Sequence, residues 1–332
     1  MINRPPERVF VTGGAGFIGS HVVARLLAEG DRVTVFDNLS RGKVGRIEPY
    51  LETGDCALVR GDLLDPNALS EALRGHDVVW HLAANTDIRA GTRAVDVDLK
   101  HCVVGTCNLL EAMRQNGVRD LLFASSGVVY GDFAADAMPE SAGPLLPVSL
   151  YAAGKLSGEA FVSAYCHLFG LRAWMFRFAN VVGRGTDHGV VYDFIQKLRR
   201  DPTELEVLGD GNQLKPYLLI DECVDGMLYA YRRIPLSDAR PADVFNLGTD
   251  TVTRVSDIAR IVIEELGLVG ARIRFTGGRR GWPGDAPVLR MDVEKMRRLG
   301  WSTTRTSDEA VRAAARQLIA EHDGVATSPA RD

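Results

Sequence analysis

The sequence predicts an α/β protein: a doubly wound parallel sheet with a smaller C-terminal α/β domain that holds the substrate. Short apolar runs alternate with segments of helical apolar spacing through the first half of the chain, which is typical of such a sheet. A glycine-rich turn joins the first run to the first helical segment. Beyond residue 180 the alternation gives way to short strands and helices in a less regular order, and this change predicts the second domain.

The glycine-rich turn is TGGAGFIG at 12–19, between an apolar run at 9–11 and a helical segment at 20–29. Strand, glycine turn and helix in this order are the context of a dinucleotide-binding fingerprint. The glycines let the backbone approach a pyrophosphate, and the free N–H groups at the start of the helix face its negative charge. We therefore expect a cofactor diphosphate to bind at Gly13, Gly16, Phe17, Ile18 and Gly19.

The second predicted strand, at 32–36, ends in Asp37. A carboxylate at this place can hold the ribose hydroxyls of an adenosine and would repel a 2′-phosphate. These residues predict a Rossmann-like domain that binds NAD in preference to NADP. Arg41, a few residues further on, keeps NADP open as the alternative.

Further strands are predicted at 57–60, 78–82, 121–124 and 173–178, and helices at 66–73, 97–116 and 151–169. The carboxyl ends of parallel strands meet at one edge of the sheet, where such proteins bind their ligands. This edge is expected to collect Asp62, Ala83, Ala84, Ser125 and Ser126 beside the glycine turn. Asp62 has a second interpretation, as the N-cap of the helix that follows it.

The second half of the chain is predicted to hold helices at 191–199, 222–231, 256–266, 291–299 and 307–322 and strands at 205–211, 217–220, 244–247 and 272–275. We expect the cofactor domain to cover 1–180, with segments around 217–250 returning to it. The substrate domain is expected at 181–322, and 323–332 as a flexible tail.

The composition excludes several classes of protein. The 332 residues are 46% apolar and 25% charged, with a net charge of −4 and a pI near 6.0, which gives no reason to expect nucleic acid or an anionic membrane as a partner. The five cysteines form no C-x-x-C pair, so neither a disulfide framework nor a metal site is expected. No signal peptide and no membrane span is expected, and we predict a cytoplasmic protein.

The pattern that indicates a reaction is YAAGK at 151–155. Positions i and i+4 share one face of a helix, so the Tyr151 phenol and the Lys155 ammonium lie together. A nearby cation stabilises phenolate and brings the pKa of a phenol, usually about 10, toward neutral pH. Ser126, at the end of a neighbouring strand, can hydrogen-bond the same substrate oxygen. Tyr151, Lys155 and Ser126 therefore predict a hydride-transfer site acting on an alcohol.

With these residues in view, the sequence resembles the extended short-chain dehydrogenase/reductase family, in its nucleotide-sugar epimerase/dehydratase branch. The resemblance runs from Val9 to about Trp301. It rests on the glycine turn and YAAGK together with DN at 37–38, GDL at 61–63, HLAA at 81–84, SSGVVYG at 125–131, RFANVVG at 177–183, GDGNQ at 209–213 and RGWPGD at 280–285.

The resemblance implies NAD as cofactor, a nucleoside-diphosphate sugar (UDP-linked) as substrate, and a homodimer formed by the helices at 97–116 and 151–169. It adds Asn38, Leu63, Leu82 and Phe178 to the cofactor contacts, which also include Tyr151 and Lys155. The substrate contacts that it implies are Ser125, Ser126, Asn180, Val207, Gln213, Lys215, Tyr217, Arg280, Asp285 and Leu289. Lys215 and Arg280 correspond to the diphosphate, Val207 and Gln213 to the base, Asp285 to the ribose, and Leu289 to the size of the sugar pocket. Tyr217 is either part of this wall or core.

One short segment distinguishes the reactions of the branch. Dehydratases carry Asp and Glu directly after the hydroxyl residue that corresponds to Ser126, and decarboxylases carry Glu at the second of these places. Here the positions hold Gly127 and Val128, which transfer no protons. The resemblance therefore favours 4-epimerisation of a UDP-hexose, UDP-hexuronic acid or UDP-N-acetylhexosamine through a 4-keto sugar. A 4-ketoreductase or dehydratase, and a non-catalytic sensor of NAD and nucleotide, remain the alternatives.

Three departures from the family pattern stand near these sites. Cys102 replaces an Asn near the Lys, and Lys215 with Pro216 replaces an Arg and its neighbour. Gly154 replaces a Ser beside Lys155, a change expected to be harmless. The first two departures indicate that the substrate is not necessarily the commonest one of the family.

Overall fold

The computed structural model describes residues 5–132, 137–282 and 284–324. The chain forms two compact units. The first consists of Met1–Val129, Pro147–Arg177 and Val224–Phe245, and the second of Tyr130–Leu146, Phe178–Cys223 and Asn246–Asp332. Pro283 of the motif at 280–285 and residues 325–332 of the expected tail lie outside the described residues.

The segment Tyr130–Leu146 was expected in the cofactor domain, but the structure groups it with the second unit. Its hydrogen bonds explain the difference: Met138 N donates to Arg290 O (3.0 Å), and Tyr130 OH donates to the Asn246 amide oxygen (2.8 Å). The part of the chain that returns to the first unit is Val224–Phe245, shorter than the expected 217–250.

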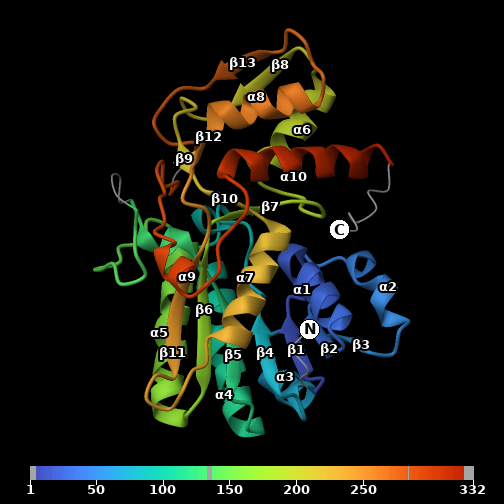
Figure 1. The fold of residues 1–332 in the computed structure, drawn as a ribbon, viewed down its shortest axis with the longest axis vertical. Coiled ribbons are helices and arrows are strands. Elements are labelled where there is room, and N and C mark those ends of the chain that lie inside the picture. The colour runs from blue at the N-terminus through green and yellow to red at the C-terminus, as the bar shows by residue number, and fades with distance from the viewer. Residues whose placement is uncertain (1–4, 133–136, 283, 325–332) are drawn as a thin grey trace. The chain divides into compact units, whose positions relative to one another are not determined.

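The first unit is built on the parallel sheet that the sequence predicts, and this sheet has seven strands (Figure 1). Its strands are β1 (Arg8–Thr12), β2 (Arg32–Asp37), β3 (Cys56–Arg60), β4 (Val78–His81), β5 (Asp120–Ser126), β6 (Arg172–Phe178) and β11 (Ala242–Leu247), in the order β11-β6-β5-β4-β1-β2-β3. Strand β1 lies between β2 and β4 and pairs with both in parallel, Val9 opposite Val33 on one side and Val78 on the other. The loops after β2 and β4 therefore flank the glycine turn.

Helices cover this sheet on both faces. They are α1 (Phe17–Ala28), α2 (Glu48–Leu51), α3 (Pro66–Leu73), α4 (Gly105–Asn116), α5 (Leu150–Phe169) and α7 (Ile220–Arg233), with 3-10 turns at Val44–Arg46, Ala90–Thr92 and Gly127–Tyr130. Helices α3, α4 and α5 pack side by side, and α1 is joined to α7 by the ion pair of Arg25 with Asp225 (2.8 Å). The buried core between sheet and helices includes Phe10, Leu109 and Phe123.

The long helix predicted at 97–116 is present over these residues, but part of it is π-helical. Residues Leu99–Val104 form a π-helical turn, and α4 begins only at Gly105. The wider turn is accompanied by a side-chain bond, because Thr106 Oγ1 donates to the carbonyl oxygen of Cys102 (2.7 Å). Such π segments place side chains differently from a regular helix and are frequent at functional sites.

Among the residues that the structure describes, the second unit contains three two-stranded sheets. Its strands are β7 (Asn180–Val182), β8 (Glu204–Val207), β9 (Leu214–Lys215), β10 (Tyr217–Leu219), β12 (Thr253–Arg254) and β13 (Arg272–Phe275), paired as β10 with β7, β12 with β9 and β13 with β8. Its helices are α6 (Val190–Arg200), α8 (Val255–Glu265), α9 (Glu294–Arg298) and α10 (Ser307–His322). Helices α6, α8 and α10 pack on one another around Ile195, Ile258 and Val311. A capping box of Thr306 and Glu309 starts α10.

Candidate active site

Tyr151 and Lys155 lie in the first two turns of α5, as the i, i+4 spacing requires. The helix begins there because Ser149 at the N-cap accepts a hydrogen bond from Ala152 N (3.2 Å). Lys155 is buried, with 4% of its surface exposed, and its Nζ lies 5.9 Å from the centre of the Tyr151 ring. Nζ also donates to Ala124 O of β5 (2.7 Å), so the sheet fixes the position of the ammonium.

Ser126 and Ser125 end strand β5 and have different roles. The side chain of Ser126 hydrogen-bonds Tyr151, so the predicted catalytic residues do come together. Ser125 turns inward and its Oγ donates to Glu159 Oε1. Glu159 forms a buried ion pair with Arg177 at 2.7 Å, the two side chains being 7% and 5% exposed. Ser125 therefore belongs to the support beneath the site rather than to its surface.

Burial dominates the electrostatics of this group. It raises the pKa of the Tyr151 phenol, with the charges of Cys102 and Asp98 acting in the same direction and the Ser126 hydrogen bond acting against them. It lowers the pKa of Lys155, which the charges of Cys102, Glu159 and Asp98 partly restore. The protein by itself therefore keeps the phenol protonated at neutral pH. The acidification expected from Lys155 alone is not what the structure shows.

The glycine turn forms a close-packed cradle. A Cβ atom on Gly13 would lie 2.7 Å from Ala83 N, and one on Gly19 would lie 2.1 Å from Gly13 O. Gly16, the N-cap of α1, supplies no side-chain cap, so the N–H groups of the first turn of α1 remain for an anion. Phe17, Ile18 and Gly19 form that turn. Leu82, Ala83 and Ala84 follow β4 directly beside this cradle.

The ends of β2 and β3 carry the residues expected at an adenosine. Asp37 Oδ2 accepts from Ala15 N (3.1 Å), and Asp37 Oδ1 accepts from Leu39 N (2.8 Å). Asn38 Nδ2 donates to Asp62 Oδ2 (3.0 Å), which brings two of the predicted residues together, with Leu63 next to them. The interpretation of Asp62 as a helix cap is wrong, because α3 is capped by Asp65. Sequence reasoning missed Gly42, where a Cβ atom would lie 2.8 Å from both Asp37 carboxylate oxygens.

A buried chain of hydrogen bonds centred on His81 connects the cradle with the π-helical turn. Thr106 donates to Cys102 O, so its Oγ1 accepts from His81 Nε2 (3.1 Å). His81 Nδ1 then accepts from Thr12 Oγ1 (2.7 Å), and Thr12 Oγ1 accepts from Ala83 N (3.3 Å). Burial lowers the pKa of His81 to about 3, so the ring is neutral and carries its proton on Nε2. The HLAA motif contains this residue, but sequence alone gave it no partner.

Cys102 and Gly154, two of the departures noted in the sequence, are in contact. A Cβ atom on Gly154 would lie 2.8 Å from Cys102 Cβ and 3.3 Å from Asp98 O. Glycine therefore allows α5 to pack closely against the π-helical turn, one residue before Lys155. Glycine is accommodated at this contact, whereas the Cβ atom of a serine would force the two elements apart; that the replacement by glycine is harmless stays a prediction.

The second unit brings together three of the predicted substrate residues. Lys215 Nζ donates to Asp285 Oδ1 (2.5 Å), and the Asp285 side chain is almost fully buried. Arg280 donates to Asp285 O and forms an ion pair with Asp132. Gln213 precedes Lys215 by two residues, and its Oε1 is buried without a hydrogen-bond partner among the described residues. In this structure the two cations expected at a diphosphate, Lys215 and Arg280, are each paired with a carboxylate.

Most of the other predicted substrate residues of this unit are buried as well. Val207 is fully buried in the core, and Leu289 is also buried. Tyr217 packs in the same core, where burial and the charge of Asp285 raise the pKa of its phenol, so it is both core and neighbour of the charged group. Asn180 stands opposite Tyr217 in the β7–β10 pair, and Phe178 ends β6.

Comparison with known proteins decides the family. Residues 9–248 match the model of the NAD dependent epimerase/dehydratase family. The chain belongs to this family. The UDP-glucose 4-epimerase of Mycolicibacterium smegmatis is 33% identical over 89% of this chain and 93% of its own length. A crystal structure of a UDP-galactose 4-epimerase has a TM-score of 0.85 and 41% identity, covering 95% of this chain and 99% of that one. A dTDP-glucose 4,6-dehydratase of an Actinoplanes species is 30% identical over 82% of this chain and 86% of its own length.

Membership of the NAD dependent epimerase/dehydratase family makes NAD the cofactor, and the residues present fit it. The glycines of the cradle have no space for a Cβ atom, which suits the close approach of a diphosphate to their backbone. The Asp37 carboxylate, expected at the adenosine, is fixed by the N–H groups of Ala15 and Leu39. Within the described ranges no group of three or more His, Cys, Asp or Glu side chains is arranged to hold a metal ion. Nor does any helix among these residues have the length and apolar character needed to cross a membrane.

Proposed function

We propose that this protein is an NAD-dependent 4-epimerase of a UDP-linked sugar: a hexose, a hexuronic acid or an N-acetylhexosamine. The observation that carries the proposal is the arrangement of Ser126, Tyr151 and buried Lys155 beside a segment without further proton-transfer groups. Gly127 and Val128 begin a 3-10 turn directly after Ser126. Relatives with this activity over nearly the whole chain support it.

In this reaction the protein moves one proton and holds the reacting groups. Tyr151 takes the proton of the sugar 4-hydroxyl and returns it after the sugar has turned over, while Ser126 hydrogen-bonds the same oxygen. Lys155, fixed by Ala124 O, keeps positive charge near the phenolate. NAD held at the glycine turn and Asp37 would supply the hydride chemistry at C4 of the sugar, and its oxidised ring would add a positive charge.

The same residues argue against the alternatives. A dehydratase has to remove the C5 proton and protonate a leaving hydroxyl, and Gly127 and Val128 offer no ionisable group for either step. A sensor without turnover has no need for the buried Lys155 and its bond to the sheet, because an unused buried ammonium is costly to maintain. A 4-ketoreductase needs the same Tyr151 and Lys155, so only product analysis separates it.

We further propose that the nucleotide is held by the second unit. Lys215 and Arg280 exchange Asp285 and Asp132 for the diphosphate, Asp285 then binds the ribose, and Gln213 and the strand at Val207 meet the base. Asn180, Tyr217 and Leu289 complete the wall. Lys215 offers one point charge, which is less directional than the guanidinium usual in the family.

The decisive experiment uses purified protein with its bound NAD and no added cofactor. UDP-glucose, UDP-glucuronate and UDP-N-acetylglucosamine are incubated separately and followed by proton NMR. Formation of the 4-epimer, abolished by Tyr151→Phe, establishes the reaction and ranks the sugars. A product that lacks water or carbon dioxide overturns the inference from Gly127 and Val128, and UDP binding without turnover of any of the three sugars removes support for these substrates.

We also propose that the protein acts as a homodimer in the cytoplasm. Exposed apolar side chains support the dimer: Leu99 and Val104 on the π-helical turn, and Phe161, Leu168 and Phe169 on α5, which packs beside it. Two copies that pair these helices would bury this surface. Light scattering after gel filtration should give twice the chain mass of 36.2 kDa. The Leu168→Glu variant should give the mass of a single chain.

A further inference from the structure

Two loops of the first unit touch the glycine turn from opposite sides. Lys43, in the loop after β2, donates its N–H to Ala15 O of the turn (2.9 Å). Ala83, in the loop after β4, packs so closely that a Cβ atom on Gly13 would lie 2.7 Å from its nitrogen. The glycine turn follows β1, which lies between β2 and β4. Neighbouring strands are about 4.8 Å apart, so the flanking loops start about 10 Å from each other.

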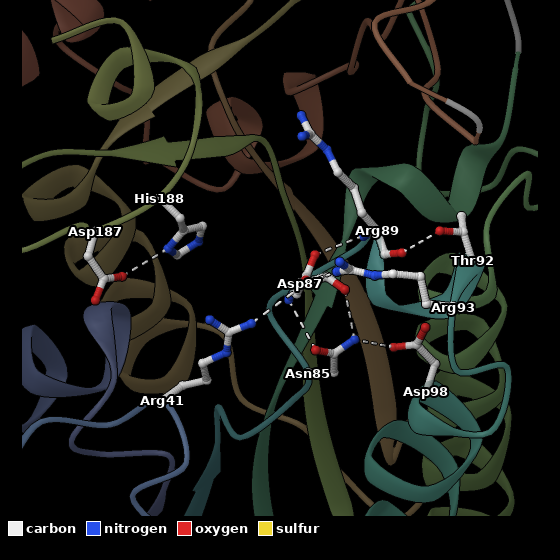
Figure 2. A network of polar contacts seen from close by, with 9 residues as sticks. All are labelled: Arg41, Asn85, Asp87, Arg89, Thr92, Arg93, Asp98, Asp187 and His188. Carbon is white, nitrogen blue, oxygen red and sulfur yellow. Dashed lines mark hydrogen bonds and ion pairs between the residues drawn. The ribbon is translucent and has the colours of Figure 1, made fainter. Parts of the chain in front are cut away.

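An ion pair joins these two loops. Arg41, after β2, and Asp87, after β4, approach to 3.7 Å between a guanidinium nitrogen and Oδ2 (Figure 2). Because the two residues belong to loops on opposite sides of β1, their side chains span the carboxyl end of that strand. Arg41 is 64% exposed and Asp87 28% exposed, so the pair forms on the solvent side of the turn.

Asp87 is held firmly on its side of this link. Asn85 Oδ1 accepts from Asp87 N (3.1 Å), and Asn85 Nδ2 donates both to Asp87 O (3.0 Å) and to Asp98 Oδ1 (2.9 Å). Asp98 is buried, with 1% of its surface exposed. The backbone of Asp87 is therefore anchored to the interior through Asn85 and Asp98, as Figure 2 shows, whereas the Arg41 side chain is 64% exposed.

We propose that Arg41 and Asp87 form a bridge that closes over bound NAD and slows its release. This inference rests on the proposed function, in which the cofactor has to stay bound through the whole reaction. A dinucleotide that runs from Asp37 at the end of β2 to Tyr151 beside β5 has to cross the glycine turn, and the bridge crosses the same place. The Arg41 guanidinium also adds positive charge beside the diphosphate. Arg41 thereby serves the diphosphate of NAD rather than a 2′-phosphate.

The test measures cofactor exchange rather than turnover. Purified holoenzyme is mixed with excess deuterated NAD, and bound cofactor is recovered by rapid desalting and analysed by mass spectrometry over time. Arg41→Met and Asp87→Asn remove one charge each, and the asparagine keeps the Oδ1 that accepts from Arg89 N. Arg93→Met is the matched control, because Arg93 also pairs with Asp87 (3.1 Å) but lies on the same loop and spans nothing.

Each of the two bridge variants should exchange NAD about two- to fivefold faster than the wild type, the range expected for one exposed ion pair. The double variant should be no faster than either single one, and Arg93→Met should match the wild type. Raising the salt concentration should speed wild-type exchange and leave Arg41→Met nearly unchanged.

Equal exchange in the wild type and Arg41→Met would overturn the bridge, and slower exchange in the variant would mean that the pair obstructs the site. Both results leave the 4-epimerase proposal standing, because the assay contains no sugar. If the bridge variants exchange NAD faster as predicted but the wild-type protein epimerises no sugar, the 4-epimerase proposal is overturned and the bridge stands. A wild-type protein that holds no NAD would overturn both.

Discussion

The catalytic group of the first unit and the charged group of the second unit are held in opposite ways. Lys155 is fixed by a backbone carbonyl and by buried neighbours, and its geometry exists without any ligand. Lys215 and Arg280 are instead paired with the carboxylates of Asp285 and Asp132, which a diphosphate can replace. The groups proposed to do chemistry are preorganised, whereas the cations proposed to hold the nucleotide are paired with carboxylates until the nucleotide arrives.

This difference has a physical reason. A general base has to stand within hydrogen-bond distance of one proton, and small displacements are costly in rate. A diphosphate is bound by charge, which tolerates exchange of partners, and the paired state avoids leaving charges uncompensated when the site is empty. Substitutions in the first unit should therefore change rate or folding, and those in the second unit should change affinity.

The largest expected effect is on rate. Tyr151→Phe removes the only proposed proton acceptor and should lower kcat about 10²- to 10⁴-fold with little change in UDP affinity. NMR assays give kcat, and calorimetry gives UDP binding. Tyr165→Phe, in the same helix, is the control and should retain activity. A Tyr151→Phe enzyme with normal kcat would refute the assignment of the base.

The support beneath the site should matter for stability. Glu159→Gln leaves the buried Arg177 guanidinium without its carboxylate and should reduce the free energy of unfolding by about 3–5 kcal/mol. Urea unfolding followed by circular dichroism measures this change. Arg114→Gln, which breaks the exposed pair with Glu111, is the control and should cost less than about 1 kcal/mol.

In the second unit the expected effect is on affinity. Lys215→Met removes a charge-assisted bond to the nucleotide and should weaken UDP binding about tenfold to a hundredfold, with kcat at saturation nearly unchanged. Lys197→Met is the matched control, since Lys197 lies on α6 and pairs with Glu206. If Lys215→Met lowers kcat and leaves the affinity for UDP unchanged, Lys215 acts on the rate and does not hold the nucleotide.

The contact between Cys102 and Gly154 gives a smaller effect. Gly154→Ser places a Cβ atom 2.8 Å from Cys102 Cβ and should destabilise the protein by about 1–3 kcal/mol. Gly45→Ser, where a Cβ atom meets no atom within 4 Å, should change stability little. Equal unfolding curves for the two variants would show that α5 and the π-helical turn can separate without cost.

A last effect appears only when the pH is lowered. His81 has a folded-state pKa of about 3, and unfolding returns it to about 6.5. The unfolded chain therefore binds an extra proton below pH 6.5, and stability falls as the pH drops from there toward 3, by at most about 1.4 kcal/mol per pH unit from this residue. His81→Gln should lose this slope while being less stable at pH 7.5. Parallel stability curves for the two proteins would contradict a buried neutral His81.

Much of the fold could be predicted because it depends on local patterns. The strands of the sheet, the glycine turn and the Tyr151–Lys155 face each follow from short-range spacing, and the structure confirms them within a residue or two at most ends. The π-helical turn at Leu99–Val104 was missed, because its residues have ordinary helical spacing and its width is tied to Thr106 and to packing. The one-turn helix α2 was missed because four residues carry no periodic signal.

By itself the sequence determined the strands of the sheet, the glycine turn, the candidate catalytic residues and the lack of ionisable groups at Gly127 and Val128, since each of these features lies in residues near one another in the chain. The tertiary structure decided which of them touch: His81 with Thr12 and Thr106, Cys102 with Gly154, and Arg41 with Asp87. It also decided the sign of the Tyr151 pKa shift. Contacts and burial depend on segments distant in the chain, and no local spacing encodes them.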